Sequence, residues 1–191
     1  MSIQRIRRSA AVVAAAFALP IALGVAAPAF GAQPADPYGP ACASVPKEGS
    51  GSLEGMAKDP VATAASNNPA LSTLVTAVKK AGLVDTLNNA KGITVFAPTN
   101  EAFAKIPKAD LDKILADKAE LTKILTYHVV GEEITPDQLR DGSFKTLEGG
   151  TLTTAGSGES FTVNGNAKIV CGDVQTANAK VNIIDTVLTP M

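Results

Sequence analysis

Apolar residues recur with helical spacing in the first half of the chain. The clearest stripe consists of Leu71, Leu74, Val75 and Val78, at positions i, i+3, i+4 and i+7. This pattern predicts an amphipathic helix with one apolar face. Asn68-Pro69 supplies a start signal before the stripe, and a glycine at position 82 follows two lysines at its end.

Weaker signals predict further short helices. Asp59-Pro60 has the form of a helix start and opens a short helix through Ala65. Two more apolar stripes, at residues 111–115 and 121–125, are out of phase with each other, which predicts two short helices or a bend near Asp117. A capping box at residues 135–138 predicts a single helical turn that ends before Gly142.

Beyond Gly142 the pattern changes to short β-prone runs. Residues 144–147 and 151–154 flank Gly149-Gly150, and residues 161–163 and 168–171 flank a turn that begins at Asn164-Gly165. Both dipeptides are typical of hairpins. An earlier strand is predicted at residues 93–97 and a last one at 181–188. Helices followed by hairpins predict an α+β fold, and no internal repeat divides it.

The N-terminal 31 residues have the composition of a cleaved signal peptide. Three arginines and no acidic residue precede an apolar run over residues 9–27, and small residues follow it. A retained membrane helix is the alternative, because a run of this length can just span a bilayer. The dominance of alanine, with Pro20 and Gly24 inside the run, favours cleavage, so no stable membrane span is expected afterwards.

The mature chain is predicted to be a mildly acidic single domain. Residues 32–52 are rich in proline, glycine, alanine and serine and read as an N-terminal tail, and the domain proper covers residues 53–191. Removing the three leader arginines leaves 14 of the 17 basic residues and all 18 acidic ones, so the mature chain has a net charge of −4. The largest basic cluster belongs to the leader, so nucleic acid is not an expected partner.

The two cysteines, Cys42 and Cys171, predict a disulfide in an exported protein. It would tie the tail to a late strand. A lipid-modified Cys42 is the alternative, but that cysteine lies far beyond the apolar run and lacks an aliphatic residue three positions earlier. A redox pair is disfavoured because the two cysteines do not form Cys-x-x-Cys.

One histidine and one aspartate stand inside otherwise apolar runs. Strand alternation places Asp185 among apolar neighbours, so we expect it to bond backbone amides or polar groups near Thr99 and Asn100 and to join the two runs. A solvent-facing aspartate at a sheet edge is the alternative. His128, the only histidine, is interpreted as a structural residue; a general base, a metal ligand, or a partner contact together with Tyr127 are the alternatives.

No motif for catalysis, phosphate binding or dinucleotide binding is present. Gly156-Ser-Gly158 lacks the remaining elements of a nucleophile elbow, and no Gly-rich phosphate loop occurs. The carboxylates at 132, 133, 137 and 141 read as a solvated surface, and a lone histidine does not build a multi-histidine site. We therefore expect no catalytic residue, metal or cofactor.

Three segments together resemble the fasciclin (FAS1) domain. Thr94-Val-Phe-Ala-Pro-Thr-Asn-Glu-Ala-Phe103 matches the first box of that family, Tyr127-His128 its central pair, and Ile184-Asp-Thr-Val-Leu-Thr-Pro190 its second box. The resemblance covers residues 53–190 and is closest to the small secreted immunogenic fasciclin proteins of Gram-positive bacteria. It implies a β-wedge or sandwich of about seven strands with several helices packed against it.

The resemblance also implies a function in adhesion. The expected protein is a secreted, non-enzymatic, monomeric module that binds a protein or polysaccharide at the cell surface or in the extracellular matrix. Tyr127 and His128 are its candidate partner contacts, and Thr99, Asn100 and Asp185 its structural polar network. The chain lacks a lipid-anchor cysteine and a cell-wall sorting signal, so it is expected to be released or held non-covalently at the wall. An extracytoplasmic carrier or sensor of a small apolar ligand is the alternative, and a hydrolase the third interpretation.

Overall fold

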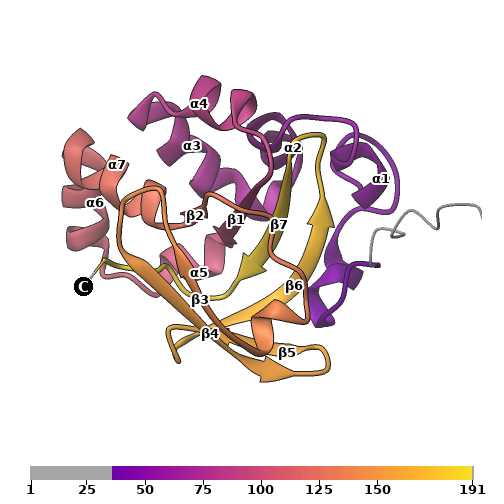
Figure 1. Ribbon diagram of the computed structural model, residues 1–191. Coiled ribbons are helices and arrows are strands. Elements are labelled where there is room, and N and C mark those ends of the chain that lie inside the picture. The colour runs from indigo at the N-terminus through magenta and orange to yellow at the C-terminus, as the bar shows by residue number, and fades with distance from the viewer. Residues whose placement is uncertain (1–35, 191) are drawn as a thin grey trace, which may run out of the picture. The chain divides into compact units, whose positions relative to one another are not determined.

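Seven strands form one mixed sheet that nearly closes on itself, within the part of the chain that the computed structural model describes, residues 36–190 (Figure 1). The predicted signal peptide lies outside the described residues. The sheet order is β2-β1-β7-β6-β5-β4-β3, and a bridge between Val130 and Thr146 joins its two ends. The strands are β1 (Ile93–Pro98), β2 (Val129–Val130), β3 (Asp141–Lys145), β4 (Thr151–Ser157), β5 (Ser160–Val163), β6 (Ala167–Gln175) and β7 (Ala179–Ile184).

Strands β1 and β7 lie at the centre and pair in parallel. Six consecutive pairs run from Ile93 beside Ala179 to Pro98 beside Ile184. All six residues of β1 are buried, as are five of the six in β7. Parallel strands covered on both faces need near-continuous apolar sequence, which explains why both runs are so rich in valine and isoleucine.

The helices gather on one side of the sheet, toward the top and left in Figure 1. The mixture of helices and strands confirms the predicted α+β class. The helices are α1 (Leu53–Met56), α2 (Val61–Asn67), α3 (Ser72–Ala81), α4 (Val84–Asn89), α5 (Asn100–Ala104), α6 (Lys108–Ala116) and α7 (Lys118–Tyr127). Three 3₁₀ turns, η1 (Pro40–Ser44), η2 (Pro69–Leu71) and η3 (Gln138–Arg140), complete the set among the described residues.

Local capping explains where several helices begin and end. The Asn68 side chain accepts from Ala70 N at 3.0 Å at the start of η2, which leads into α3, and Gly82 ends α3 in the left-handed conformation at φ 74°. Asp117 caps α7 by accepting from two backbone amides, so the bend predicted there is a break between two helices. These boundaries follow the sequence signals.

Two predicted boundaries are wrong. Asp59 does not cap α2; Asn178, from the β6–β7 turn, accepts from Val61 N at 2.8 Å instead. The last strand, predicted at residues 181–188, spans Ala179–Ile184 instead, because the chain beyond Ile184 no longer pairs with β1. Helix α4 had no counterpart among the predicted elements.

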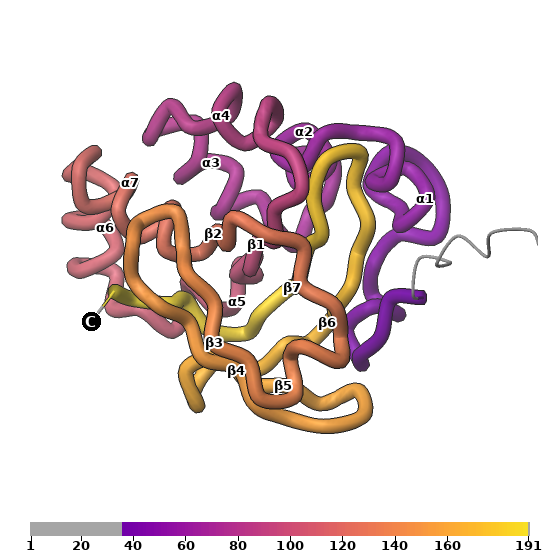
Figure 2. The backbone as a smooth tube through the Cα atoms, in the orientation of Figure 1, coloured from indigo at the N-terminus to yellow at the C-terminus, as the bar shows by residue number. Residues whose placement is uncertain are grey.

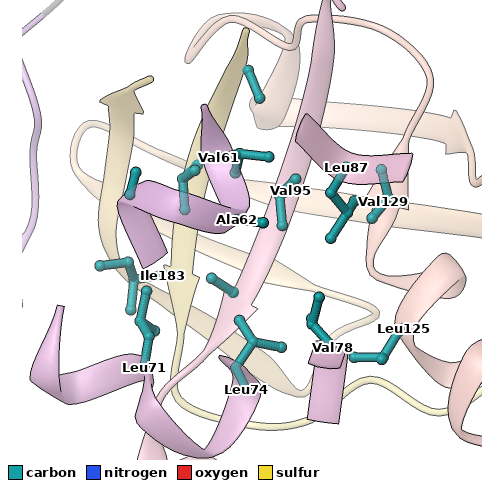
Figure 3. Close-up of a cluster of buried hydrophobic side chains, with 14 of the residues drawn as sticks. Val61, Ala62, Leu71, Leu74, Val78, Leu87, Val95, Leu125, Val129 and Ile183 are labelled. Atoms are coloured by element: carbon teal, nitrogen blue, oxygen red, sulfur yellow. The ribbon is translucent and has the colours of Figure 1, made fainter. Parts of the chain in front are cut away.

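The core is divided by the sheet into two clusters. The larger lies between the helices and the β1–β7 centre, where Leu74 and Val78 of α3 face Val95 and Val129 (Figure 3). The smaller lies within the curved β-half and is built from Phe96, Phe144, Leu152, Phe161 and other residues of the hairpins. Burying the inner faces of both hairpins leaves their outer faces to solvent.

A disulfide attaches the N-terminal segment to β6. Cys42 in η1 and Cys171 are paired, with their Cα atoms 4.9 Å apart. The backbone of Tyr38 also pairs with Gly172, so the segment drawn in indigo runs beside β6 (Figure 2). A bond that closes a loop over a sequence separation of 129 removes much chain entropy from the unfolded state.

Replacing both cysteines with alanine should lower the free energy of unfolding by about 2–5 kcal/mol. Urea denaturation followed by circular dichroism measures this change. The wild-type protein in dithiothreitol is the control and should fall to a similar stability, whereas the variant should not respond to the reductant. Equal stability of oxidised and reduced wild-type protein would contradict a stabilising role for the bond.

Candidate functional site

His128 is a buried connector at the end of α7. Its ring is 2% exposed; Nδ1 donates to Ile124 O at 2.8 Å, and Nε2 accepts from Leu188 N at 2.9 Å. The acceptor role of Nε2 fixes the neutral tautomer with the proton on Nδ1. Burial lowers the pKa of His128 from 6.5 to about 4, although the bond to the Ile124 carbonyl acts the other way. The structure therefore uses both ring nitrogens to join α7 to the segment after β7.

Tyr127 is equally buried, at 2% exposed. Its hydroxyl donates to Thr151 O at 3.0 Å and accepts from Asn164 Nδ2 at 3.1 Å. The prediction that Tyr127 and His128 contact a partner is therefore wrong for this conformation. The pair lies inside the protein because α7 must be joined to both the β4 hairpin and the C-terminal segment.

Asp185 lies just beyond the end of β7 and bonds to β6. Its Oδ1 accepts from Lys168 N at 2.8 Å, and Asp185 N donates to Lys168 O at 3.1 Å, so the side chain extends the antiparallel ladder by one bond. Oδ2 pairs with Lys105 at 3.2 Å. Partial burial would raise the pKa of this carboxyl group, but the hydrogen bonds from Lys168 and Thr186, and the Lys105 ammonium, outweigh it and lower the pKa.

The expected bond from Asp185 to Thr99 or Asn100 is not formed. The strand ends at Ile184, one residue too early for the alternation that the prediction assumed, so the carboxylate turns toward β6. Thr99 instead caps α5 by accepting from Ala102 N at 3.2 Å, and its own amide donates to Ile184 O at 3.1 Å. The two boxes are joined by backbone pairing.

Asn100 serves the helical layer. Its Oδ1 accepts from Thr73 N at 2.9 Å and its Nδ2 donates to Pro69 O at 2.9 Å, which fixes α5 against the start of α3. The three residues predicted as one polar network thus belong to separate contacts. Each satisfies backbone groups at the end of a regular element, where a helix or strand cannot satisfy its own.

A second ion pair, which is buried, was not predicted from the sequence. Asp173, at φ 57° in a β6 bulge and 2% exposed, pairs with Lys180 at 2.8 Å, and its amide donates to Asn182 Oδ1 at 3.0 Å. Burial, followed by the Asp173 charge, raises the pKa of the Tyr38 hydroxyl nearby. An aspartate in a β-run gives no sequence signal of a bulge, so only coordinates locate this cluster.

An apolar cleft opens between the helical layer and the sheet. Helices α2, α3, α4 and α7 and strands β1, β2 and β7 contribute its walls, and Leu147 from the β3–β4 turn lies at its rim. Its unfilled space, including the open mouth, is about 800 Å³, of which about 50 Å³ admits a water-sized molecule. The cleft is thus narrow. In Figure 3 the side chains of Val78, Leu87, Val95, Leu125 and Val129 converge on this region.

The outer face of β3, β4 and β5 carries hydroxyl groups. Ser143 lies opposite Thr153, Lys145 opposite Thr151, and Ser157 opposite Ser160. Residues directly opposite in a ladder share one face, and these alternate with the buried Phe144, Leu152 and Phe161 on the inner side. We call this surface, together with Ala155 and Thr162, the outer hydroxyl face.

Neither predicted site residues nor other side chains converge into a reactive constellation. Among residues 36–190, no group of three His, Cys, Asp or Glu side chains is arranged to hold a metal ion. In the same part of the chain, no helix combines the length and hydropathy needed to cross a membrane. What the described structure offers a ligand is a narrow apolar cleft and an exposed polar face.

Sequence comparisons identify relatives over most of the chain. The Fasciclin domain family model matches residues 69–190. Cell surface glycolipoprotein MPB83 of Mycobacterium bovis is 49% identical over 177 residues, covering 86% of this chain and 79% of the relative. Immunogenic protein MPB70 of the same species is 46% identical over 181 residues, covering 88% of this chain and 92% of the relative. Protein sll1483 of Synechocystis is 41% identical over 128 residues, covering 66% of this chain and 71% of the relative.

A solved structure shares the fold. It is a FAS1 domain pair from the insect cell adhesion molecule Fasciclin I, with a TM-score of 0.50 and 23% sequence identity. The match covers 62% of this chain and 45% of that one. At this identity the likeness supports the architecture alone.

His128 predicts a dependence of stability on pH. Its folded pKa, about 4, lies below its unfolded value of 6.5, so the unfolded state binds the proton first as pH falls. Its contribution is complete above pH 6.5 and is lost as pH falls to about 4, by about 3 kcal/mol in total. Urea denaturation at pH 7 and at pH 4 measures most of this loss. His128→Gln is expected to be less stable, but its side chain does not titrate, so the part of the pH dependence of the unfolding free energy that comes from His128 should vanish. An unchanged pH dependence would refute the assignment of this effect to His128.

Asp185→Ala should lower the free energy of unfolding by about 1–2 kcal/mol, because the backbone amide of Lys168 loses a charged acceptor. Lys105→Ala should cost less than about 1 kcal/mol, because its ammonium is 53% exposed and the ion pair is screened. Thermal and urea denaturation compare the two variants. A larger loss for Lys105→Ala than for Asp185→Ala would show that the ion pair, and not the ladder bond, dominates.

Proposed function

Because the chain belongs to the fasciclin domain family, we propose that it is a secreted, non-enzymatic binding module that attaches to a protein or polysaccharide partner at the cell surface or in the extracellular matrix. Two relatives bear the names of a cell surface glycolipoprotein and an immunogenic protein, and the related insect protein is called a cell adhesion molecule. These names support an extracellular location and an adhesive role.

The observation that carries the proposal is the outer hydroxyl face. It extends over three adjacent antiparallel strands, and the helices gather elsewhere on the molecule (Figure 1). The hydroxyls of Ser143, Thr151 and Ser160 make no hydrogen bond to the described residues, so they are free to bond a partner. Threonine is stiff at χ1, so ordering it at an interface costs little side-chain entropy.

The polar residues of the interior support the non-enzymatic part of the proposal. His128 has both ring nitrogens engaged by backbone groups, so it has no free nitrogen with which to move a proton. The carboxylate of Asp185 bonds Lys168 and Lys105 near the strand end. These groups are used to hold the fold together, which leaves recognition to the surface.

A binding experiment with a blocked face tests this function. The secreted protein, immobilised, should retain material from the cell envelope and culture medium, whereas Thr151→Glu/Ser160→Glu should retain about tenfold less, since two carboxylates crowd the face. Thr151→Glu lies opposite Lys145, so it gains an opposite charge and the sheet remains folded.

Thr63→Glu/Ser50→Glu is the matched control, because both positions are exposed and lie outside the face. It should retain as much material as the wild type. Protease treatment of the retained fraction distinguishes a protein partner, and periodate oxidation a polysaccharide. Equal retention by all three proteins would remove the outer hydroxyl face from the interface, and no retention by the wild type would overturn the proposed function.

A further inference from the structure

The apolar cleft is suited to a thin apolar ligand. Its walls are almost entirely carbon: aliphatic side chains from α2, α3 and α4 face Val95 and Val129 of the sheet. His128 borders it but has both nitrogens bonded elsewhere, so it offers the cleft no free polar group. Apolar cavities remain dry and bind apolar molecules, because water finds no hydrogen-bond partners inside.

The small free volume of the cleft favours an unbranched chain over a ring system. About 50 Å³ of its 800 Å³, which includes the open mouth, admits a water-sized molecule, and we call this narrow free space the slot. A second apolar gap, between α5, α6 and α7, is smaller, with about 20 Å³ of such space and 400 Å³ in all. The first cleft is therefore more open than an ordinary packing gap elsewhere in this protein.

Leu147 gives the cleft an exposed apolar rim. At 48% it is the one large hydrophobic side chain exposed among the described residues, and it projects from the β3–β4 turn. Its backbone is fixed, because Leu147 N donates to Val129 O at 2.8 Å. A side chain that is exposed on a fixed backbone can rotate over a ligand without disturbing the sheet.

Three exposed lysines flank one side of the cleft. Lys79 lies one helical turn after Val75 on α3, Lys123 lies three residues before Thr126 on α7, and Val75 and Thr126 both line the cleft. The ammonium of Lys118 lies 3.7 Å from the position of a Cβ on Gly82, directly before the cleft-lining Leu83.

None of these three lysines forms an ion pair within residues 36–190. Asp85 and Glu148 also lie next to lining residues, and Glu148 accepts a hydrogen bond from Gly150 N. Helices α3 and α7 together carry four lysines and one acidic residue, Glu120, so these two helices bear a net positive charge.

We propose that this cleft binds the alkyl chain of an anionic amphiphile, with the chain in the slot and the headgroup beside Lys79, Lys118 and Lys123. The shared chemistry is a single saturated chain that ends in a carboxylate or phosphate. This is a second binding activity, separate from that of the outer hydroxyl face, because the two surfaces share only the β3–β4 hairpin, which contributes Leu147 to the rim of the cleft. It places the protein among the extracytoplasmic carriers of lipid chains.

Displacement of a fluorescent fatty acid, cis-parinarate, from the purified secreted protein tests the proposal. Palmitate should displace it with a saturable, one-site curve, and Ala65→Phe should weaken palmitate binding at least about tenfold, because Ala65 is a half-buried wall residue and the ring would fill the slot. Ala116→Phe, the same change on the exposed end of α6, is the matched control and should bind as the wild type does.

Changing Lys79, Lys118 and Lys123 to glutamine should weaken the binding of palmitate about tenfold. The binding of hexadecanol, its uncharged analogue, should be unchanged. Gln substitutions at Lys47, Lys58 and Lys108 are the control. Lysophosphatidate in place of palmitate, and vesicles of phosphatidylglycerol, distinguish a free fatty acid, a single-chain phospholipid and a bilayer as the source of the chain.

Leu147→Ser keeps the test decisive if Ala65→Phe fails to fold, since the side chain is exposed and its change should weaken binding several-fold without altering the melting temperature. The proposal would be overturned if the wild type showed no saturable parinarate binding. It would also be overturned if Ala65→Phe and Leu147→Ser both bound palmitate as tightly as the wild type does. Loss of palmitate binding in Thr151→Glu/Ser160→Glu would contradict the separation of the two surfaces.

Discussion

The parallel pairing of β1 with β7 is the contact on which the remaining structure depends. It joins residues from opposite ends of the domain in six consecutive pairs, and the two strands are buried almost throughout. The other strands extend the sheet from the two free edges of this pair. A shift of one residue would turn the buried side chains of the centre to the wrong face. Non-local pairing of this kind closes a long loop, which costs entropy that local contacts do not repay.

Polar residues in the interior form hydrogen bonds that join this central pair of strands to the neighbouring elements. Thr94 of β1 accepts from Ile134 N and donates to Glu132 O, both at 2.8 Å, so it fixes the connection after β2. His128 fixes α7, and Asp185 fixes β6. Each bond is between a side chain and the backbone, so each is lost if the strand register changes. The polar residues of the family boxes are therefore committed to the fold, whereas apolar residues of the first box, such as Val95 and Ala97, also line the apolar cleft.

The sequence predicted best those features that depend on local chemistry. The stripe of α3 and its end at Gly82, the break at Asp117 and the turn at Asn164-Gly165 follow from neighbouring residues, and each is present. The partners of Asp185 and the burial of Tyr127 could not be derived in this way, because they depend on where β7 ends and on which hairpin covers α7. The same holds for Asp173, whose left-handed conformation arises from a bulge between two strands. The apolar cleft also has no local signal, since its walls are mostly ordinary core residues from nine helices and strands.

The β3–β4 hairpin is the one element that the outer hydroxyl face and the apolar cleft share. Its strands carry the face, and its turn carries Leu147 at the rim of the cleft. Coupling between the two would require the hairpin backbone to move, because a ligand changes a distant site only through a difference in free energy between two conformations. That backbone is held to β2 by the Val130–Thr146 bridge and the bond from Leu147 N to Val129 O. Rotation of the Leu147 side chain breaks neither contact, so the cleft can fill while the face keeps its shape.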